Sequence, residues 1–200
     1  RALAGQSVLM SGRVRVQGVA LARVADMERA RLVAMLPQTD RGDGGLRVEE
    51  LVALGRTPHL GLWGHLGPDD HAAVQRALSE CGLTELRERP LDRLSGGERQ
   101  RARIAMTLAQ QSPLLLLDEP ANHLDLRRRH QLFELLGRLR RERQLVLVLV
   151  LHDLQDAFRE ADEVLLLAQG KAARVGPGDP DRVARLAAAF RVPVERIPAI

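Results

Sequence analysis

Two adjacent carboxylates follow a run of four leucines, residues 114–117. A short run with no polar alternation predicts a strand buried on both faces of a parallel sheet, and active sites in such sheets lie at the carboxyl ends of strands. Asp118 would emerge where a magnesium ion can sit over phosphates. Glu119 beside it could polarise an attacking water. The alternative is a strand that ends in a charged turn, a common arrangement with no chemistry.

A serine and two glycines open a second candidate site, in the segment Leu-Ser-Gly-Gly-Glu-Arg-Gln at residues 94–100. Gly96 and Gly97 would let a ligand approach the backbone closely. The helix expected to begin here offers unpaired N–H groups and the positive end of its dipole, which suit a phosphate oxygen. Ser95 could equally be an N-cap after a flexible turn. These seven residues by themselves do not decide between the two interpretations.

A histidine ends the second apolar strand, residues 145–151. His152 would lie at the same sheet edge as Asp118, where an imidazole can donate a hydrogen bond to a terminal phosphate. A lone histidine is more often a satisfied structural residue. Its place at the end of a strand expected in the same sheet as Asp118 favours the functional interpretation.

The elements that must position these residues fall into two regions. Amphipathic helices at 48–54 and 72–83 predict a small helical lobe. From residue 91 onward, apolar strands alternate with helices, which predicts an α/β fold with a mostly parallel sheet flanked by helices. The strands expected there are 114–117, 145–151 and 163–168, with helices at 98–111, 126–143, 154–161 and 179–190 and a hairpin at Gly170. Before the lobe, the short apolar run 32–36 is stopped by Pro37, which predicts a strand end.

Together these segments resemble the ATPase family of ABC transporters. Residues 94–100 match its signature motif, and residues 114–120 match its Walker B strand with the catalytic glutamate. Residues 121–125 are similar to its D-loop, with alanine where threonine or serine is commoner. His152 is similar to its switch histidine, and Gln38 to its Q-loop glutamine. The five motifs are in the family's order, and the resemblance covers essentially the whole chain.

The resemblance implies a P-loop NTPase-like cassette with ATP and Mg²⁺ as ligands. It implies that Gln38 reaches magnesium and the attacking water, that Asp118 holds magnesium through water, and that Glu119 is the general base. His152 would contact the γ-phosphate. The division it implies is an ATPase core with the Q-loop in residues 1–45, a helical lobe in 46–90, and the core with the remaining motifs in 91–200.

The same resemblance implies a head-to-tail pair of subunits. Ser95 and Gly97 would contact the γ-phosphate of ATP bound by the partner, and Gly96 and Gln100 belong to the same nucleotide-binding motif. Asp125 would sit at the dimer seam. Each ATP would lie between one subunit's phosphate loop and the other's signature motif.

One motif of the family does not occur in the sequence, the phosphate loop G-x-x-x-x-G-K-[ST]. The single lysine, Lys171, follows Gly170 late in the chain. We therefore expect an N-terminally truncated cassette that, by itself, binds ATP weakly and hydrolyses little or none, because the loop's lysine and N–H groups make most of the phosphate contacts. A missing strand would also leave a sheet edge unpaired.

Residues 51–64 (LVALGRTPHLGLWG) resemble the subgroup that imports ferric siderophores, haem and cobalamin. We therefore expect the ATP-hydrolysing subunit of such an importer, peripheral on the cytoplasmic face of the membrane. Its expected partners are a second copy, permease subunits docked on residues 57–66, and indirectly a substrate-binding protein. Two alternatives remain: a soluble ABC ATPase that acts on ribosomes or DNA, and a non-catalytic or truncated cassette.

Composition weighs against several classes of protein. The net charge is +4, but acidic residues are interspersed among the arginines, which indicates a solvated surface. One Trp, three Phe and no Tyr make a base-stacking platform hard to build, so we expect no nucleic-acid partner. The only cysteine, Cys81, excludes an internal disulfide, and its neighbours Leu78 and Leu83 indicate a packed thiol.

Overall fold

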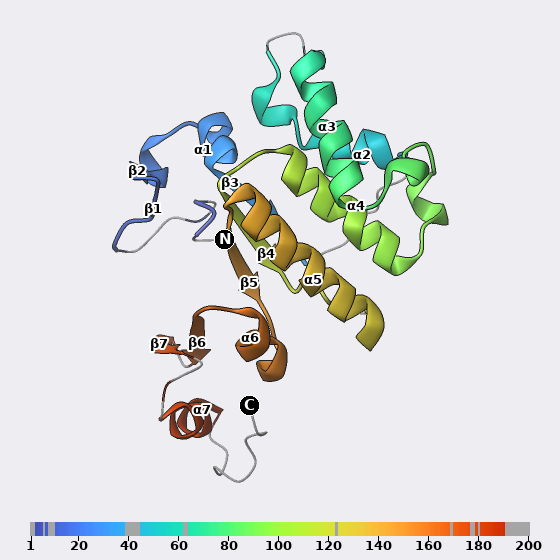
Figure 1. Cartoon of the computed structure of the whole chain (residues 1–200). Coiled ribbons are helices and arrows are strands. Elements are labelled where there is room, and N and C mark those ends of the chain that lie inside the picture. The colour runs from blue at the N-terminus through green and yellow to red at the C-terminus, as the bar shows by residue number, and fades with distance from the viewer. Residues whose placement is uncertain are drawn as a thin grey trace. The chain divides into compact units, whose positions relative to one another are not determined.

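The computed structural model describes residues 3–5, 7, 11–38, 45–61, 64–122, 124–168, 170–176, 179 and 181–190. The chain forms two compact units, Arg1–Val150 and Leu151–Ile200 (Figure 1). The strands are β1 (Arg15–Val16), β2 (Val19–Ala20), β3 (Val33–Leu36), β4 (Leu114–Asp118), β5 (Val146–Val150), β6 (Val164–Ala168) and β7 (Lys171–Val175). The helices are α1 (Asp26–Leu32), α2 (Val48–Leu54), α3 (Pro68–Glu80), α4 (Gly96–Ala109), α5 (Leu126–Arg143), α6 (Leu154–Glu160) and α7 (Arg182–Phe190).

Within the described ranges, no helix combines the length and the apolar character that crossing a bilayer requires.

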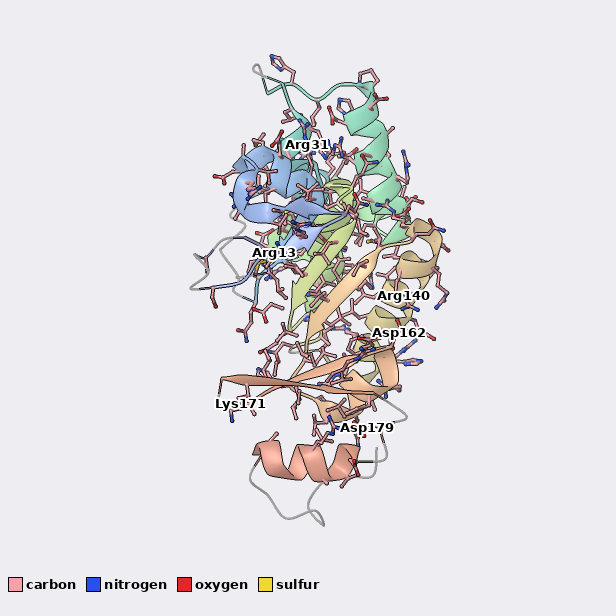
Figure 2. The ribbon with its side chains drawn as sticks, turned by 90° about the vertical axis from the view of Figure 1, so that its left-hand side faces the viewer. Arg13, Arg31, Arg140, Asp162, Lys171 and Asp179 are labelled. Carbon is pink, nitrogen blue, oxygen red and sulfur yellow. The ribbon has the colours of Figure 1, made fainter. Side chains whose placement is uncertain are left out.

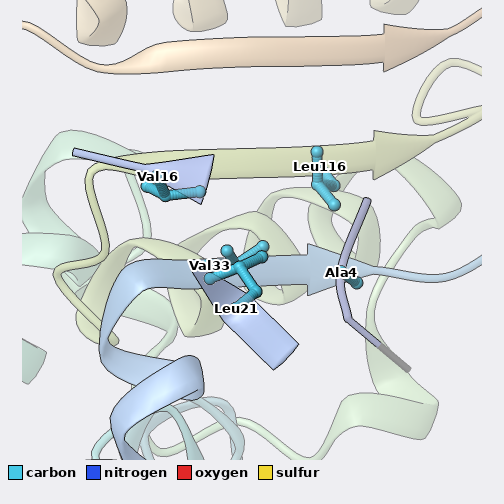
Figure 3. Close-up of a cluster of buried hydrophobic side chains, with 5 residues drawn as sticks. All are labelled: Ala4, Val16, Leu21, Val33 and Leu116. Carbon is cyan, nitrogen blue, oxygen red and sulfur yellow. The ribbon is translucent and has the colours of Figure 1, made fainter. Parts of the chain in front are cut away.

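The first unit is built on a parallel sheet in the order β3-β4-β5. The register places Leu36 opposite Leu117 and Asp118 opposite Val150. Figure 3 shows the three strands running in the same direction. This confirms the predicted α/β fold and the prediction that the strand before His152 lies in one sheet with Asp118.

Both faces of this sheet are covered, as four leucines in a row require. On one face Val33 and Leu116 pack with Val16 and Leu21 from the N-terminal segment (Figure 3). Alternate residues of the same strands are buried on the other face, and α4 contacts β3 there. These residues are Ala34, Leu36, Leu115 and Leu117.

The outer strand β5 is less well covered than its sequence suggests. Val146 is 60% exposed and Val150 is 49% exposed, although all five residues of β5 are apolar. In the described part of the chain β5 pairs with β4 alone. An apolar edge of this kind invites pairing with another strand.

The helical lobe consists of α2 and α3, which pack against each other and against α4. A Cβ at Gly55, which ends α2, would lie 2.1 Å from the carbonyl oxygen of Met106 in α4. Arg56 follows and is 4% exposed. Its Nη1 donates to the carbonyl oxygen of Ala109 at 2.6 Å, and its Nε donates to Asp70 at 2.8 Å. The turn after α2 is therefore held against α4 by the close packing at Gly55 and by the hydrogen bonds of Arg56. We call this contact the clamp.

Several helix boundaries differ from the prediction, and those of α3 and α4 have a clear physical reason. We expected a helix at 72–83, but α3 begins at Pro68, because a proline suits the first helical position and Asp70 accepts the Gly67 N–H at 3.0 Å. It ends at Glu80, before Gly82 at φ +64°. We expected the next helix to begin at 98, but α4 begins at Gly96.

The start of α4 is a capping box, which explains the earlier boundary. Ser95 Oγ accepts from the Glu98 N–H at 3.3 Å, and the Glu98 carboxylate accepts from the Ser95 N–H at 2.8 Å. Hydrogen bonds from Ser95 hold the pKa of Glu98 below its ordinary value. The N-cap interpretation of Ser95 is thus correct. It leaves a role in phosphate binding open, because a hydroxyl that accepts one hydrogen bond can still donate another.

The second unit comprises α6, the antiparallel hairpin β6–β7 and α7. Its core joins Phe158, Val164, Val175 and Leu186. Lys171 lies at the turn end of the hairpin (Figure 2). The predicted hairpin at Gly170 is confirmed, with Gly170 at φ +74°.

Replacement of Gly55 by alanine tests the clamp between the lobe and α4. We expect Gly55→Ala to lower the free energy of unfolding by about 3 kcal/mol, because the new methyl group meets a backbone oxygen that cannot move aside. Gly137→Ala is the matched control. Gly137 is a helical glycine in α5 whose Cβ would meet only the end of Arg141 at 3.6 Å. It should stabilise the chain by about 0.5–1 kcal/mol. Urea unfolding measures both, and an equal effect of the two variants would contradict the clamp.

The capping box predicts a pH-dependent contribution to stability. The pKa of Glu98 is lowered in the folded chain, so its contribution is complete above the unfolded pKa of about 4.3 and is lost as pH falls through the lower folded value. Glu98→Gln keeps the side-chain acceptor but removes the charge. We expect it to lower the free energy of unfolding by about 0.5–1 kcal/mol at pH 7. The difference from the parent should shrink as pH falls below the unfolded pKa and vanish once pH is below the lowered folded pKa; a difference independent of pH would contradict this assignment.

Candidate active site

The parallel register brings Gln38 and Glu119 together at the carboxyl ends of β3 and β4. Leu36 is opposite Leu117, so the residues two places further along, Gln38 and Glu119, follow at the same level of neighbouring strands. Strands in a sheet lie about 4.8 Å apart, which suits side-chain contact. Gln38 Nε2 donates to Glu119 Oε2 at 2.8 Å. The contact joins residues that are 81 positions apart in the chain.

The backbone at Glu119 turns sharply away from the sheet. Glu119 has φ +50°, in the left-handed region, which costs a residue with a side chain about 1–3 kcal/mol and is frequent at functional sites. Its N–H donates to the carbonyl oxygen of Val150 at 3.0 Å, which extends the ladder between β4 and β5 by one bond. Among the described residues with positive φ other than glycine, it is the one directly following a strand of the parallel sheet.

Asn122 also contacts Glu119, although the sequence pattern assigned it no role. Its Nδ2 donates to Glu119 Oε2 at 2.7 Å, and its backbone N–H donates to the Glu119 carbonyl oxygen at 3.1 Å. The sequence did contain a pattern that could have predicted this contact: an asparagine three residues after an acidic residue, in a turn that contains proline. Asn side chains often form hydrogen bonds to neighbouring residues in turns.

We define the carboxylate cluster as the three hydrogen-bonded residues Gln38, Glu119 and Asn122 together with Asp118, which precedes Glu119 in the chain. Its carboxylate and amide groups include donor types that magnesium takes. Asp118 ends β4 and is partly exposed, so it is accessible. Carboxylate and amide oxygens are the ligands that Mg²⁺ prefers, and this ion usually keeps several waters and takes only one or two protein carboxylates. Asp118 and the amide oxygen of Gln38 would be the residues to hold it.

A second cluster lies where Gly97 of the signature motif comes close to Asp125, the last residue of the D-loop, through Arg128. Asp125 caps α5 by accepting the Arg128 N–H at 2.9 Å, and its carboxylate lies 3.3 Å from Arg128 Nε. The side-chain stem of Arg128 would lie 3.2 Å from a Cβ on Gly97. Arg128 therefore joins the start of α4 to the start of α5, and it brings Gly97 and Asp125 into one neighbourhood. A Cβ on Gly96 would meet nothing within 4 Å.

A cavity of about 630 Å³ opens beside this second cluster. Its volume is in the range of small-ligand sites. Four residues of the signature motif line it, Ser95, Gly97, Glu98 and Gln100. Cys81 also lines it, but burial raises the pKa of this thiol to about 12, so Cys81 is not a nucleophile at neutral pH. This confirms the packed thiol.

The structure thus groups the predicted site residues into two clusters, joined by residues 119–125. His152 follows β5 and belongs to the second unit, so its predicted role is not connected to either cluster by the geometry. His123, within the D-loop, lies outside the described residues.

Comparison with known proteins agrees with the motifs. The family model described as "ABC transporter" matches residues 1–122. The chain is 41% identical over 166 residues to the iron(3+)-hydroxamate import ATP-binding protein FhuC of Bacillus subtilis, covering 83% of the chain and 62% of that protein. It is 42% identical over 165 residues to the ferric enterobactin transport ATP-binding protein FepC of Escherichia coli, covering 82% and 61%. It is 44% identical over 179 residues to the hemin import ATP-binding protein HmuV of Streptomyces coelicolor, covering 88% and 62%.

The fold agrees as well. A chain of a metal-chelate type ABC transporter, solved in an inward-facing conformation, superposes with a TM-score of 0.83 at 26% identity, covering 96% of this chain and 71% of that one. The chain spans a little over three-fifths of the length of the curated relatives described above. The resemblance to the ATPases of siderophore and haem importers is confirmed, and by its motifs, its relatives and its fold the chain belongs to the ABC transporter family.

Proposed function

We propose that this chain is the catalytic part of an ATP-hydrolysing subunit that energises an ABC importer. The observation that carries the proposal is the hydrogen bond of 2.8 Å between Gln38 and Glu119 at the carboxyl ends of adjacent parallel strands. Two residues that a hydrolytic water needs thus lie together, although they are remote in sequence.

In the proposed reaction Glu119 accepts a proton from the water that attacks the γ-phosphate of ATP. Gln38 orients that water from the neighbouring strand. Asp118 and Gln38 would hold Mg²⁺, which neutralises charge on the phosphates when bound. His152 would donate a hydrogen bond to the γ-phosphate. The protein's contribution is positioning and charge stabilisation, as phosphoryl transfer requires.

The second cluster would act on ATP held by a second copy of the chain. The N–H groups at the start of α4, with Ser95, Gly96 and Gly97, offer donors and a positive dipole end to the γ-phosphate. Gln100 adjoins them in the cavity. Asp125 would lie at the seam between the subunits, where its contact with Arg128 connects the seam to the signature helix.

The substrate class follows from the relatives. FhuC, FepC and HmuV are named for the import of iron(3+)-hydroxamate, ferric enterobactin and hemin. We propose that the importer carries a ferric siderophore or a related metal chelate such as haem or cobalamin. The chelate would pass through permease subunits supplied by a binding protein, and the ATPase would lie peripherally on the cytoplasmic face of the membrane, without a nucleic-acid partner.

We propose that residues 57–66 contact the permease. The hydrogen bonds that attach this segment to the rest of the first unit support the proposal. Arg31 Nε donates to the Pro58 carbonyl oxygen at 2.8 Å, and His59 Nε2 is hydrogen-bonded to the Gln110 carbonyl oxygen at 2.8 Å. The Gln110 side chain in turn donates to the Val33 carbonyl oxygen at 3.1 Å. A displacement of this turn would thus act on β3, which ends two residues before Gln38. The proposed division into residues 1–45, 46–90 and 91–200 follows these roles.

Hydrolysis of Mg-ATP tests the proposal. We expect the 200-residue chain to show little or no activity, because it carries no phosphate-loop motif. The chain extended upstream through that loop should be active, and Glu119→Gln in the extended form should lower kcat by at least about 100-fold. Glu85→Gln, at an exposed carboxylate in the lobe, is the control and should leave kcat unchanged.

Each of two results would contradict one of these expectations. An extended form that is well folded and inactive would favour the non-catalytic cassette. Activity in the 200-residue chain itself would show that the phosphate-loop motif is dispensable.

A further inference from the structure

Two amide groups donate to the same oxygen of Glu119. Gln38 Nε2 lies 2.8 Å from Glu119 Oε2, and Asn122 Nδ2 lies 2.7 Å from it. Gln38 and Asn122 are both exposed, so each bond competes with water. A contact of this kind persists only where the backbone holds the donor in place.

The backbone holds Asn122 far more firmly than it holds the side chain of Gln38. The Asn122 N–H donates to the Glu119 carbonyl oxygen at 3.1 Å, so residue 122 is bonded to residue 119 twice, once through its backbone and once through its side chain. Pro120 lies between them and is buried, and its ring restricts the turn. The Asn122 contact is therefore local and supported by the fold of the turn.

The hydrogen bond from Gln38 to Glu119 has less support from the backbone than the one from Asn122. Gln38 reaches Glu119 from another strand, with a side chain of three rotatable bonds and no second hydrogen bond to Glu119 in the described structure. It can leave Glu119 by rotating its side chain, with the backbone unchanged. If Gln38 turns toward magnesium or water during hydrolysis, Asn122 still donates to Glu119 and orients it.

We infer that Asn122 is the positioning residue of Glu119: it holds the carboxylate in place while Gln38 exchanges between Glu119 and the reacting groups. The inference rests on the proposed function, in which Glu119 is the general base. It assigns to the asparagine of the turn a role that a side chain without an N–H donor cannot fill. Aspartate has the same shape but would place a like charge against Glu119.

A spectroscopic test addresses the contact without any activity. Asn122 is the only asparagine in the sequence, so labelling with ¹⁵N-asparagine yields one side-chain amide pair, assigned without ambiguity. We expect Glu119→Ala to shift this pair in the 200-residue chain and Glu85→Ala, at an exposed carboxylate outside the cluster, to leave it in place. Gln38→Ala should leave the pair close to its parent position. An Asn122 signal that does not respond to Glu119→Ala would overturn the inference.

A kinetic test addresses the consequence, in the chain extended through its phosphate loop. Asn122→Ala should lower kcat about 10-fold with KM for ATP changed less than two-fold, because a small displacement of Glu119 should cost less than the roughly 100-fold that a misplacement of about 1 Å can cost. Asn122→Asp, which is isosteric, should lower kcat further through repulsion. An unchanged kcat in both variants, where Glu119→Gln is inactive, would overturn the inference and leave the proposed function standing. A fully active Glu119→Gln would instead overturn the proposed function, and the inference with it.

Discussion

The parallel pairing of β3 with β4 is the constraint on which the rest of the site depends. The register that places Leu36 opposite Leu117 also places Gln38 level with Glu119, and side chains in strands have a period of two. A slip of one residue would move Val33 and Ala34 each to the opposite face of the sheet. Both side chains are buried but differ in volume, so close packing on the two faces favours the observed register, and this register brings Gln38 to Glu119.

At the starts of three helices, the residue that caps the helix also belongs to a candidate site motif or adjoins one. Ser95 caps α4, Asp125 caps α5 and Asp153 caps α6, in each case by accepting backbone N–H groups. A cap satisfies donors that the helix leaves unpaired. Since these three residues belong to or adjoin the motifs of the family, their types serve stability whether or not a nucleotide is bound. This is why a short motif alone could not separate a capping role from a binding role.

Arginines join the lobe to the rest of the first unit. Arg56 reaches from the end of α2 to the last carbonyl group of α4. Arg143, at the end of α5, donates to the Leu108 carbonyl oxygen at 3.0 Å and pairs with Glu80 at 2.6 Å. A guanidinium group offers several donors in a fixed plane, so one side chain ties the ends of α3, α4 and α5 together. Arg56 and Arg143 thus connect helix ends within the first unit.

The sequence by itself determined the class of fold, most of the elements and the motifs. Apolar runs without alternation identified β4 and β5, and Pro37 marked the end of β3, because these signals are local. The bounds of α5 were predicted without error, whereas α3 and α4 began earlier than expected, because their first turns carry proline or glycine and depend on capping bonds.

Tertiary structure decided which residues meet. Nothing in the local pattern relates Gln38 to Glu119 across 81 positions; strand register does. The left-handed backbone of Glu119, the two hydrogen bonds of Asn122 to it, and the contact of Arg128 with Gly97 depend on torsion angles and packing that several distant segments impose jointly. Periodicity reports what a segment must bury, but only the packed chain determines what lies beside it.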